Sequence, residues 1–367
     1  MIAQTFTPEG ERPMIQPELL EKFSNPRGDI LVGVSANDGI HTNALIAGAC
    51  FAVEDAIDAG NEIANEINLL WRNDGRDADT AIRVAEQYCH ERVTAVLGHL
   101  SASASISASN IYARNGIIFF ASGTSHKALC TPDKNTVFRL CAEDDAQAQA
   151  LITFARQKLR ASSFYLVVQD IEYGHSLKSH ICECLGEEEL AHEVLIVSSP
   201  SELGALCVTL KSLENINLPA VVFVCAIHEN AIGYINRMVD LGYTGPILAG
   251  DDCNLDQFWQ NIHVTRGGIY VSKLASVNTS LSSNEDGLSK RFQDHFSTSP
   301  SAYFLTSYSA MQIIINSIQH NREDLSIPLE SLIRSNQWPT AYGELSFDAV
   351  GNVNELRWDI YGSDWPR

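Results

Sequence analysis

Residues 95–125 read AVLGHLSASASISASNIYARNGIIFFASGTS, and this stretch decides the fold class. It begins with a short apolar run, Ala95–Gly98, continues with a segment of helical spacing, Ala102–Arg114, and ends with a second apolar run, Ile117–Phe120, before the polar segment 121–125. Apolar runs this short, bounded by glycine and polar residues, are typical of buried strands. The stretch therefore predicts two parallel strands joined by a crossover helix.

The same alternation of strand and helix extends in both directions from this unit. It runs from about residue 30 to residue 120 and restarts after residue 160. Two rounds of alternation predict an α/β protein with two parallel sheets, each flanked by helices. Strands are predicted at 30–34, 67–71, 164–168, 194–197, 221–224, 246–249, 343–347 and 356–361, and helices at 44–59, 77–90, 173–185, 201–213, 229–241, 288–296 and 303–318.

The composition excludes several classes of protein. The 367 residues include 25 Lys and Arg against 45 Asp and Glu, a formal charge of −20, and so acidic a surface repels the phosphates of nucleic acids. Hydrophobic residues make up 45% and charged residues 19%, as in folded globular chains. No run approaches the ~20 apolar residues of a membrane-spanning helix. We therefore expect neither nucleic-acid binding nor membrane insertion of this chain.

Two further features bear on organisation and compartment. Residues 1–28 contain scattered prolines, and we interpret them as an N-terminal tail or linker with a short helix near 18–23. The chain has nine cysteines, an odd number, and most lie in apolar runs such as Val222–Ala226. Cysteine packs there as a small hydrophobic residue, so we expect reduced thiols, which favours a reducing compartment.

The residues that directly follow the strands are the candidate site, because open parallel sheets bind ligands beyond the carboxyl ends of their strands. Two of these segments, 99–105 and 121–125, are rich in Ser and Thr, and their hydroxyls and free backbone N–H groups predict a cradle for a carboxylate. Ser and Thr at such positions also serve as helix N-caps, which is the structural alternative. Across the crevice, Asp252 could hold an ammonium, so the two walls match the two ends of an amino acid.

A series of short motifs runs through the chain in a characteristic order. Gly98–Ser103 and Ala121–Ser125 are followed by Tyr173-Gly174, Gly250–Asp252 and finally Gly343–Asp348. Together these segments resemble the leucine/isoleucine/valine-binding protein family, which shares the type I periplasmic-binding-protein fold with amide sensors and receptor ligand-binding domains. Further matches are Asn110–Tyr112, Gly116–Ile118, Phe138-Arg139, Asp144, Gln147 and Gly267-Gly268.

The resemblance implies a two-lobed fold, with two parallel sheets flanked by helices and a hinge of three strands. Each lobe is then built from separate stretches of the chain. It places 29–139 plus 274–330 in lobe 1 and 140–273 plus 331–367 in lobe 2. The ligand would bind between the lobes, which would close over it.

The resemblance also implies roles for particular residues. The segment Gly123, Thr124 and Ser125 would contact a ligand carboxylate through backbone N–H groups and a hydroxyl. Tyr173 would close over the ligand, and Asp252 would take its amino group.

At three places the sequence departs from the family pattern. The usual serine of the first cluster falls at Ala102, so Ser101 or Ser103 would substitute for it. Two pocket aromatics are replaced by His41 and by either Ile227 or His228, which predicts a more polar pocket. A disulfide of some relatives is absent, because its positions hold Gly75 and Ser101.

Other chemistries have little support in the sequence. His180, Cys182 and Cys184, with His175 and His192 nearby, superficially resemble a metal cluster, but the spacing matches no structural zinc site and we expect no metal there. We find no nucleophile elbow, phosphate-binding loop or dinucleotide fingerprint, so we expect a protein that is not an enzyme and binds no cofactor. Repressors of this fold begin with a DNA-binding helix-turn-helix. Residues 1–28 do not provide one, so this role would require a further segment upstream of them.

Two binding roles remain open. The chain could be the solute receptor of an ABC importer, with an ABC permease as partner, or a ligand-sensing domain that signals to a protein partner. The resemblance favours the first role and a periplasmic or extracytoplasmic location. The absence of a secretory-signal pattern and the unpaired cysteines favour the second, with a cytoplasmic location as the alternative.

Overall fold

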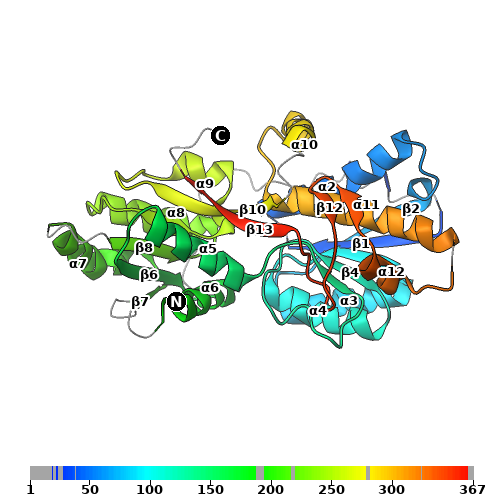
Figure 1. Ribbon diagram of the computed structural model, residues 1–367, viewed down its shortest axis with the longest axis horizontal. Helices are drawn as coiled ribbons and strands as arrows, with labels where there is room; N and C mark the ends of the chain where they lie inside the picture. Colours follow the sequence, from blue (N-terminus) through cyan, green and yellow to red (C-terminus); the bar gives the residue numbers. More distant parts are fainter. Residues whose placement is uncertain are drawn as a thin grey trace, which may run out of the picture.

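Two β-sheets, each flanked by helices, form the two halves of the molecule in a computed structural model (Figure 1). The structure describes residues 19, 22–23, 28–37, 39–186, 194–215, 220–277, 282–323 and 325–362. Within the two large sheets, every described strand pairing is parallel except that of β13 with β10. The predicted α/β class and the two flanked parallel sheets are confirmed.

The first sheet has the strand order β2-β1-β3-β4-β5. Gly98 ends β3 with a φ of +121°, and a Cβ there would lie 2.0 Å from the carbonyl oxygen of Ser35. Only glycine tolerates both conditions, and it lets the segment after β3 begin close against β1. The strands are β1 Ile30–Ala36, β2 Ile67–Asn73, β3 Ala95–Gly98, β4 Ile118–Ala121 and β5 Val137–Arg139, and the helices between them are α2 Ile40–Asp58, α3 Ala78–Glu91 and α4 Ala102–Arg114.

The second sheet has the strand order β13-β10-β9-β8-β6-β7. Its central strand β8 is buried along its whole length, as a continuous apolar run predicts for a sheet covered on both faces. The strands are β6 Ser163–Gln169, β7 Val194–Val197, β8 Ala220–Cys225, β9 Ile247–Ala249, β10 Ile269–Ser276 and β13 Leu356–Gly362. The helical segments are α5 Asp144–Gln157, α6 Glu172–Leu185, η2 Pro200–Leu203, α7 Gly204–Asn215, α8 His228–Asp240, η3 Asp251–Cys253 and α9 Asp256–Asn261.

After β10 the chain returns to the first half. Helix α11 (Ala302–Glu323) packs along α2, and Ser307 there donates a hydrogen bond of 2.6 Å to the Leu45 carbonyl. Gly48 allows this contact, because a Cβ would lie 2.3 Å from the carbonyl oxygen of Phe304. The other late elements are α10 Ser282–Phe296, α12 Leu329–Ser335, β11 Trp338–Thr340 and β12 Gly343–Leu345.

The packing bears on one predicted lobe boundary. Ile333, Trp338 and Leu345 are buried in one apolar cluster with residues of α2 and α11, although the predicted division assigns 331–367 to lobe 2. In this structure the chain rejoins the second sheet only at β13. It thus passes between the halves after β5, after β10 and before β13.

The N-terminal prediction falls mostly on residues outside the described part of the chain. Leu19 and Phe23 are described as helical, and both are buried in the core of the first half at 2% and 1% exposure. Part of the predicted tail is therefore packed against the first half. Among the described residues, no helix has the length and apolar character needed to cross a membrane.

Candidate ligand site

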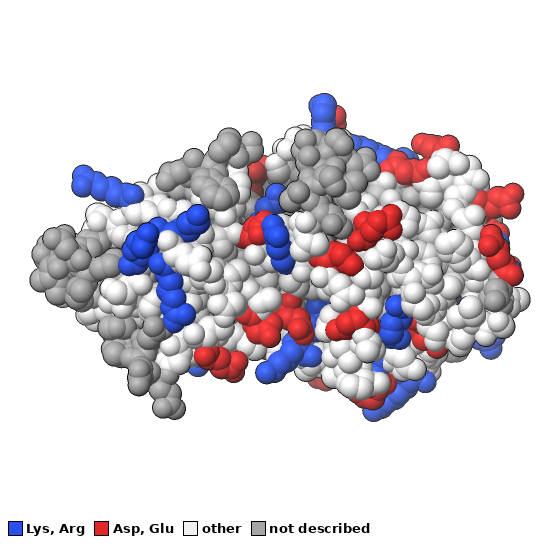
Figure 2. Space-filling model, in the orientation of Figure 1, with Lys and Arg blue, Asp and Glu red and all other residues white. Residues whose placement is uncertain are grey.

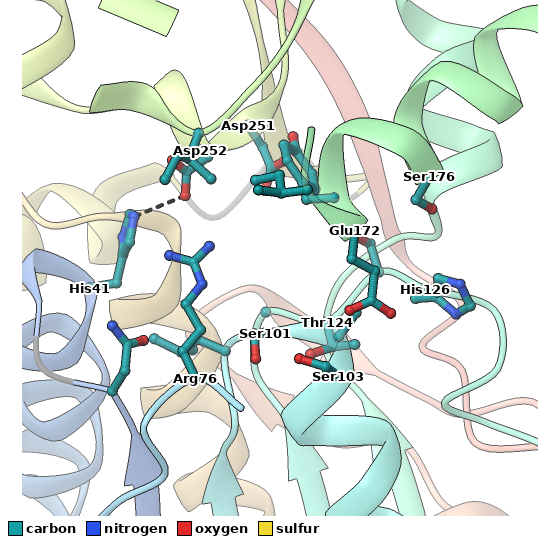
Figure 3. Close-up of a pocket in the computed structure, with 18 of the residues that line it drawn as sticks. His41, Arg76, Ser101, Ser103, Thr124, His126, Glu172, Ser176, Asp251 and Asp252 are labelled. Atoms are coloured by element: carbon teal, nitrogen blue, oxygen red, sulfur yellow. Dashed lines mark hydrogen bonds and ion pairs between the residues drawn. The ribbon is translucent and has the colours of Figure 1, made fainter. Parts of the chain in front are cut away.

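A cavity of about 450 Å³ lies where the carboxyl ends of the strands of the two sheets face each other (Figure 3). Its walls come from loops and helix starts that follow β1, β3 and β4 on one side, and β6, β8 and β9 on the other. All ten residues selected from the sequence line it, so the structure brings them together. They are His41, Ser101, Ala102, Ser103, Gly123, Thr124, Ser125, Tyr173, His228 and Asp252.

The start of α4 forms one wall of the cavity. Ser101 is the N-cap of this helix, and its Oγ accepts a hydrogen bond of 3.4 Å from the Ala104 backbone N–H. Ser101 and Ser103 lie together with Thr124 on the lower wall in Figure 3. Backbone N–H groups of a first helical turn carry partial positive charge, so this wall suits an anionic group.

The hydroxyl of Thr124 is oriented differently from the expectation. Thr124 is 2% exposed, and its hydroxyl donates to the His99 carbonyl at 3.1 Å and shares a hydrogen bond of 2.5 Å with Ser105 Oγ. These bonds lie within the first half of the protein. What Thr124 offers to the cavity in this structure is its backbone and methyl surface, not a free hydroxyl.

Asp252 lies on the opposite wall and accepts three hydrogen bonds. Its Oδ1 is 3.1 Å from His41 Nε2, and its Oδ2 is 2.8 Å from His228 Nδ1 and 2.7 Å from the His228 backbone nitrogen. His41 belongs to α2 of the first half, whereas His228 and Asp252 belong to the second half. Asp252 and His41 therefore form a direct contact between the halves.

The charge states of this cluster follow from these contacts. Burial favours the neutral form of Asp252, but the hydrogen bonds from His228 and His41 outweigh it and hold the carboxyl pKa well below its usual range. Burial also lowers the pKa of His228, and the hydrogen bond and charge of Asp252 more than offset this and raise it overall. Since an ionised carboxylate only accepts hydrogen bonds, the facing ring nitrogens act as donors.

Asp251 is held in a different way from its neighbour. Its Oδ1 accepts a hydrogen bond of 2.7 Å from Gln147 Nε2 and one of 3.1 Å from the Tyr173 hydroxyl. Burial is the main reason that its pKa is raised to about 6, with the charges of Asp252 and Asp144 adding to the effect. Tyr173 thus reaches the cavity wall with its hydroxyl bonded to Asp251, which the sequence did not predict.

Several residues of the wall were missed by the sequence analysis. The Tyr303 ring, at the start of α11, lies 4.7 Å from the His41 ring, and a Cβ at Gly123 would lie 2.3 Å from its Cε1. Arg76 and Glu172 project into the cavity from opposite halves (Figure 3). Tyr303 follows no strand, so the rule that selected the other residues could not find it. Glu172 does follow a predicted strand and was within reach of that rule.

The cavity is predominantly acidic. Arg76 is the only Lys or Arg among its lining residues, whereas five lining residues carry carboxyl groups. On the face shown in Figure 2, acidic side chains lie over the waist of the molecule and over the half that carries the first sheet. The electrostatic field of the site therefore favours a ligand with a cationic group. The acidic lining residues are Asp144, Glu172, Glu229, Asp251 and Asp252.

The rejected metal cluster does not assemble in the described residues. His180 Nδ1 faces Glu183 at 3.4 Å, and Cys182 and Cys184 are free thiols. His192 lies outside the described residues. All nine cysteines of the chain are described, and none of them is bonded to another.

Comparisons with known proteins agree with this architecture. Residues 30–361 match the family model described as periplasmic binding protein. A Leu/Ile/Val-binding protein homolog 2 from Brucella abortus is 26% identical over 337 residues, which cover 88% of this chain and 87% of the relative. An amino acid binding protein from Pseudomonas aeruginosa is 23% identical, covering 92% of this chain and 90% of the relative.

Solved structures share the fold. The branched-chain amino acid transporter substrate-binding protein from Streptococcus pneumoniae, in complex with isoleucine, superposes with a TM-score of 0.76 at 18% identity and covers 91% of this chain and 99% of its own. A solute-binding protein of an ABC transporter from Rhodopseudomonas palustris, in complex with 3,4-dihydroxybenzoic acid, superposes with a TM-score of 0.68 at 12% identity. The match covers 90% of this chain and 92% of that protein. The family match over residues 30–361, together with this fold, means that the chain belongs to the periplasmic binding protein family.

Proposed function

We propose that this chain binds an amino acid in the cavity between its halves, without chemical change of the ligand. The observation that carries the proposal is the polarity of the cavity: one wall is the N-terminal turn of a helix with two serines, and the other is acidic. An amino acid presents a carboxylate and an ammonium, so it pairs with both walls at once. The resemblance to Leu/Ile/Val-binding proteins supports the same ligand class.

The carboxylate of the ligand would lie against the start of α4. Ala102, Ser103, Gly123 and Ser125 line this part of the cavity, and their backbone N–H groups, with the Ser103 hydroxyl, would be the donors to the carboxylate. Because the Thr124 hydroxyl bonds within the protein, the carboxylate would rely on these groups rather than on that hydroxyl. Such charge-assisted bonds to backbone N–H groups are shorter and stronger than neutral ones.

The ammonium would lie against the acidic wall, with Asp252 as its partner. A carboxylate has about four acceptor positions, and Asp252 uses three for His41 and for the side chain and backbone of His228. The remaining position, on Oδ1, is open to one N–H of the ligand. Glu172 projects from the second half towards Ser103 and Thr124 on the helix wall, so it is not a partner of the ammonium in this arrangement (Figure 3).

The side chain of the ligand would contact a more polar surface than a branched aliphatic group prefers. The resemblance gives the positions of two pocket aromatics to His41 and to either Ile227 or His228. All three line the cavity, as do Arg76 and Gln169. Polar groups in a binding pocket that find no partner reduce affinity, so a polar side chain is favoured over leucine or valine. An aromatic carboxylate, as in the Rhodopseudomonas palustris complex, is the second candidate, because it needs only the helix wall.

The physiological role follows the family. We propose that the chain is the solute receptor of an ABC importer in the periplasm, with a permease as its partner. A ligand-sensing domain that signals through lobe closure is the alternative. Deletion of the gene separates these roles: uptake of the bound amino acid falls only if the chain delivers it to a permease.

The test is a calorimetric titration of the purified chain, in EDTA, with each of the common amino acids. For every ligand that binds, its N-acetyl derivative and its methyl ester serve as matched controls, since each removes one charge. We expect binding of a free amino acid and loss of affinity with both derivatives. A thermal melt gives an independent reading, because a ligand at 100 times its Kd adds about 2.7 kcal/mol of stability. Benzoate binding without any amino-acid binding would overturn the proposal.

A further inference from the structure

His41, His228 and Asp252 form a compact cluster on the cavity wall. One ring nitrogen from each histidine and one oxygen of the carboxylate lie within 4.8 Å of one another. The three residues come from positions far apart in the sequence and from three elements, α2, α8 and η3. No spacing rule for metal ligands in sequence could have detected this cluster, because its members converge only in the folded chain.

The donor set suits a particular class of ion. Two imidazoles and one carboxylate are ligands that divalent first-row transition metals accept with open positions left over, whereas Mg²⁺ and Ca²⁺ require mostly oxygen ligands. Bonds of about 2.0–2.2 Å to a common ion place neighbouring ligand atoms roughly 3 Å apart. The distances from Asp252 to His41 (3.1 Å) and to His228 (2.8 Å) already match this separation.

The surroundings favour a cation and leave it reachable. The side chains of His41 and Asp252 keep 17% and 13% of their surface exposed, and all three residues line the cavity. Four further carboxyl groups line the same cavity against the single guanidinium of Arg76. The side chains are also pre-oriented: the His228 backbone N–H bonds to Asp252 Oδ2 at 2.7 Å, and the His41 ring packs edge-on against Tyr303.

We propose that His41, His228 and Asp252 bind a divalent transition-metal ion such as Zn²⁺, Ni²⁺ or Co²⁺ at the junction of the two halves. In the metal-free state the carboxylate accepts hydrogen bonds from both rings. In the loaded state the ion takes the place of the shared protons, and both rings present lone pairs to it. Because His41 comes from one half and the other two ligands from the other, the ion fastens the halves together, and its open positions face the cavity.

This site and the amino-acid site share Asp252 but are separate claims. The metal-free chain can take an ammonium at the free acceptor position of Asp252, whereas the loaded chain offers a metal with open positions to the same end of the ligand. The two proposals therefore fail independently. Amino-acid titration in EDTA tests the first, and metal titration without any amino acid tests the second.

The experiment uses the full, untagged chain, stripped with EDTA and returned to metal-free buffer under reducing conditions. Ni²⁺, Co²⁺ and Zn²⁺ are titrated by calorimetry, with Mg²⁺ as the comparison ion. The ligand variants are His41→Gln, His228→Gln and Asp252→Asn. His263→Gln is the matched control, because His263 also pairs with an aspartate, Asp240 at 2.9 Å, but is exposed and lies outside the cavity.

We expect one ion to bind per chain and no response to Mg²⁺. Each of the three ligand variants should lose metal affinity. The loss should exceed the roughly 10–100-fold that follows when only a hydrogen-bond partner of a metal ligand is removed. The His263→Gln chain should bind like the parent. The visible spectrum of the Co²⁺ form gives a second reading that does not depend on stability, and His41→Gln should change it while the chain still melts cooperatively. An unchanged affinity in all three ligand variants, or an intense thiolate-to-metal charge-transfer band that assigns the ion to cysteine, would overturn the proposal.

Discussion

His41 Nε2 lies 3.1 Å from Asp252 Oδ1, and this contact joins two residues that are 211 positions apart in the sequence and on opposite halves of the molecule. The His41 ring also contacts Tyr303 on its own half and His228 on the other, at ring-centre distances of 4.7 and 5.6 Å. This hydrogen bond therefore connects the two halves directly. We therefore expect closure of the cleft to depend in part on this imidazole.

Replacing His41 by alanine should shift the population towards more open molecules. A hydrogen bond to a charged group contributes about 1.5–3 kcal/mol, and its loss across a hinge changes an open–closed equilibrium by roughly tenfold or more. Small-angle X-ray scattering in EDTA should give a larger radius of gyration for His41→Ala. The His263→Ala chain should scatter like the parent. Identical scattering from the parent, His41→Ala and His263→Ala would mean that the contact between His41 and Asp252 does not hold the halves together.

Replacing Thr124 by valine should lower stability rather than remove a ligand contact. The substitution keeps the shape but removes the hydrogen bonds of the Thr124 hydroxyl; because Ser105 still donates to the His99 carbonyl, we expect a cost of about 0.5–1.5 kcal/mol. Urea denaturation measures this loss, and Thr124→Ser, which keeps the hydroxyl, should recover most of it. If Thr124→Val instead kept full stability and lost affinity for the ligand, the hydroxyl would belong to the binding site as the family resemblance implies.

Asp251 should make the chain less stable as the pH rises from about 4 to about 6. Burial raises its pKa to about 6, so over this range the folded state holds a proton that the unfolded state has released. Stability then falls with rising pH, by about 3 kcal/mol in total for a shift near two units. Asp251→Asn removes this ionisation but can still accept from Gln147 and Tyr173. Its advantage over the parent should grow up to pH 6 and then stay constant.

Asp252 should have the opposite effect on how the stability of the chain depends on pH. The histidine hydrogen bonds hold its pKa below the usual range, so its ionised form favours folding above about pH 4, and this contribution is lost as the pH falls through the folded pKa. Asp252→Asn should therefore be less stable than the parent at neutral pH. Urea denaturation across pH 4–8 in EDTA measures the stability of Asp251→Asn and of Asp252→Asn relative to the parent. Parallel curves for Asp251→Asn and the parent would contradict the raised pKa.

The cysteines should react slowly in the folded chain. Burial raises the pKa of Cys141, Cys225 and Cys253 well above that of a free thiol, and the thiolate is the reactive form. Titration with an aromatic disulfide reagent at neutral pH should detect few thiols before unfolding and all nine in denaturant. Fast reaction of more than the half-buried Cys89, Cys182 and Cys184 would contradict the packing.

The strands with continuous apolar runs could be predicted from the sequence, because burial on both faces of a parallel sheet leaves a direct signature. β3 and β7 were predicted to the residue. β5 was missed because it has only three residues, and β10 because its sequence, IYVSKLAS, mixes Ser and Lys with apolar residues. Helix α5 was missed because the acidic and amide residues of its first turns obscure the apolar stripe of Ala148, Leu151 and Ile152.

The location of the site could be predicted, but its internal bonding could not. Strand ends converge at one edge of each sheet, so residues such as Ser103 and Asp252 were identified from position alone. Their partners depend on how elements far apart in the sequence pack together, both within each half and between the halves, which no local pattern encodes. That is why the histidine pair on Asp252 and the ring of Tyr303 appear only in the folded structure.

Gly123 sets the position of Tyr303 and gives a final test of how the wall is built. A Cβ at residue 123 would lie 2.3 Å from Cε1 of Tyr303, so Gly123→Ala must displace this ring, which in turn packs against His41. Overpacking of this kind costs about 1–3 kcal/mol, and it also disturbs the imidazole that contacts Asp252.

Gly204→Ala is the matched control, because Gly204 begins α7 in helical conformation and a Cβ there meets nothing within 4 Å. Urea denaturation and ligand calorimetry should show lower stability and weaker binding for Gly123→Ala, and no loss for Gly204→Ala. Full stability and affinity in Gly123→Ala would mean that Tyr303 can move away freely. The ring would then have no part in positioning His41.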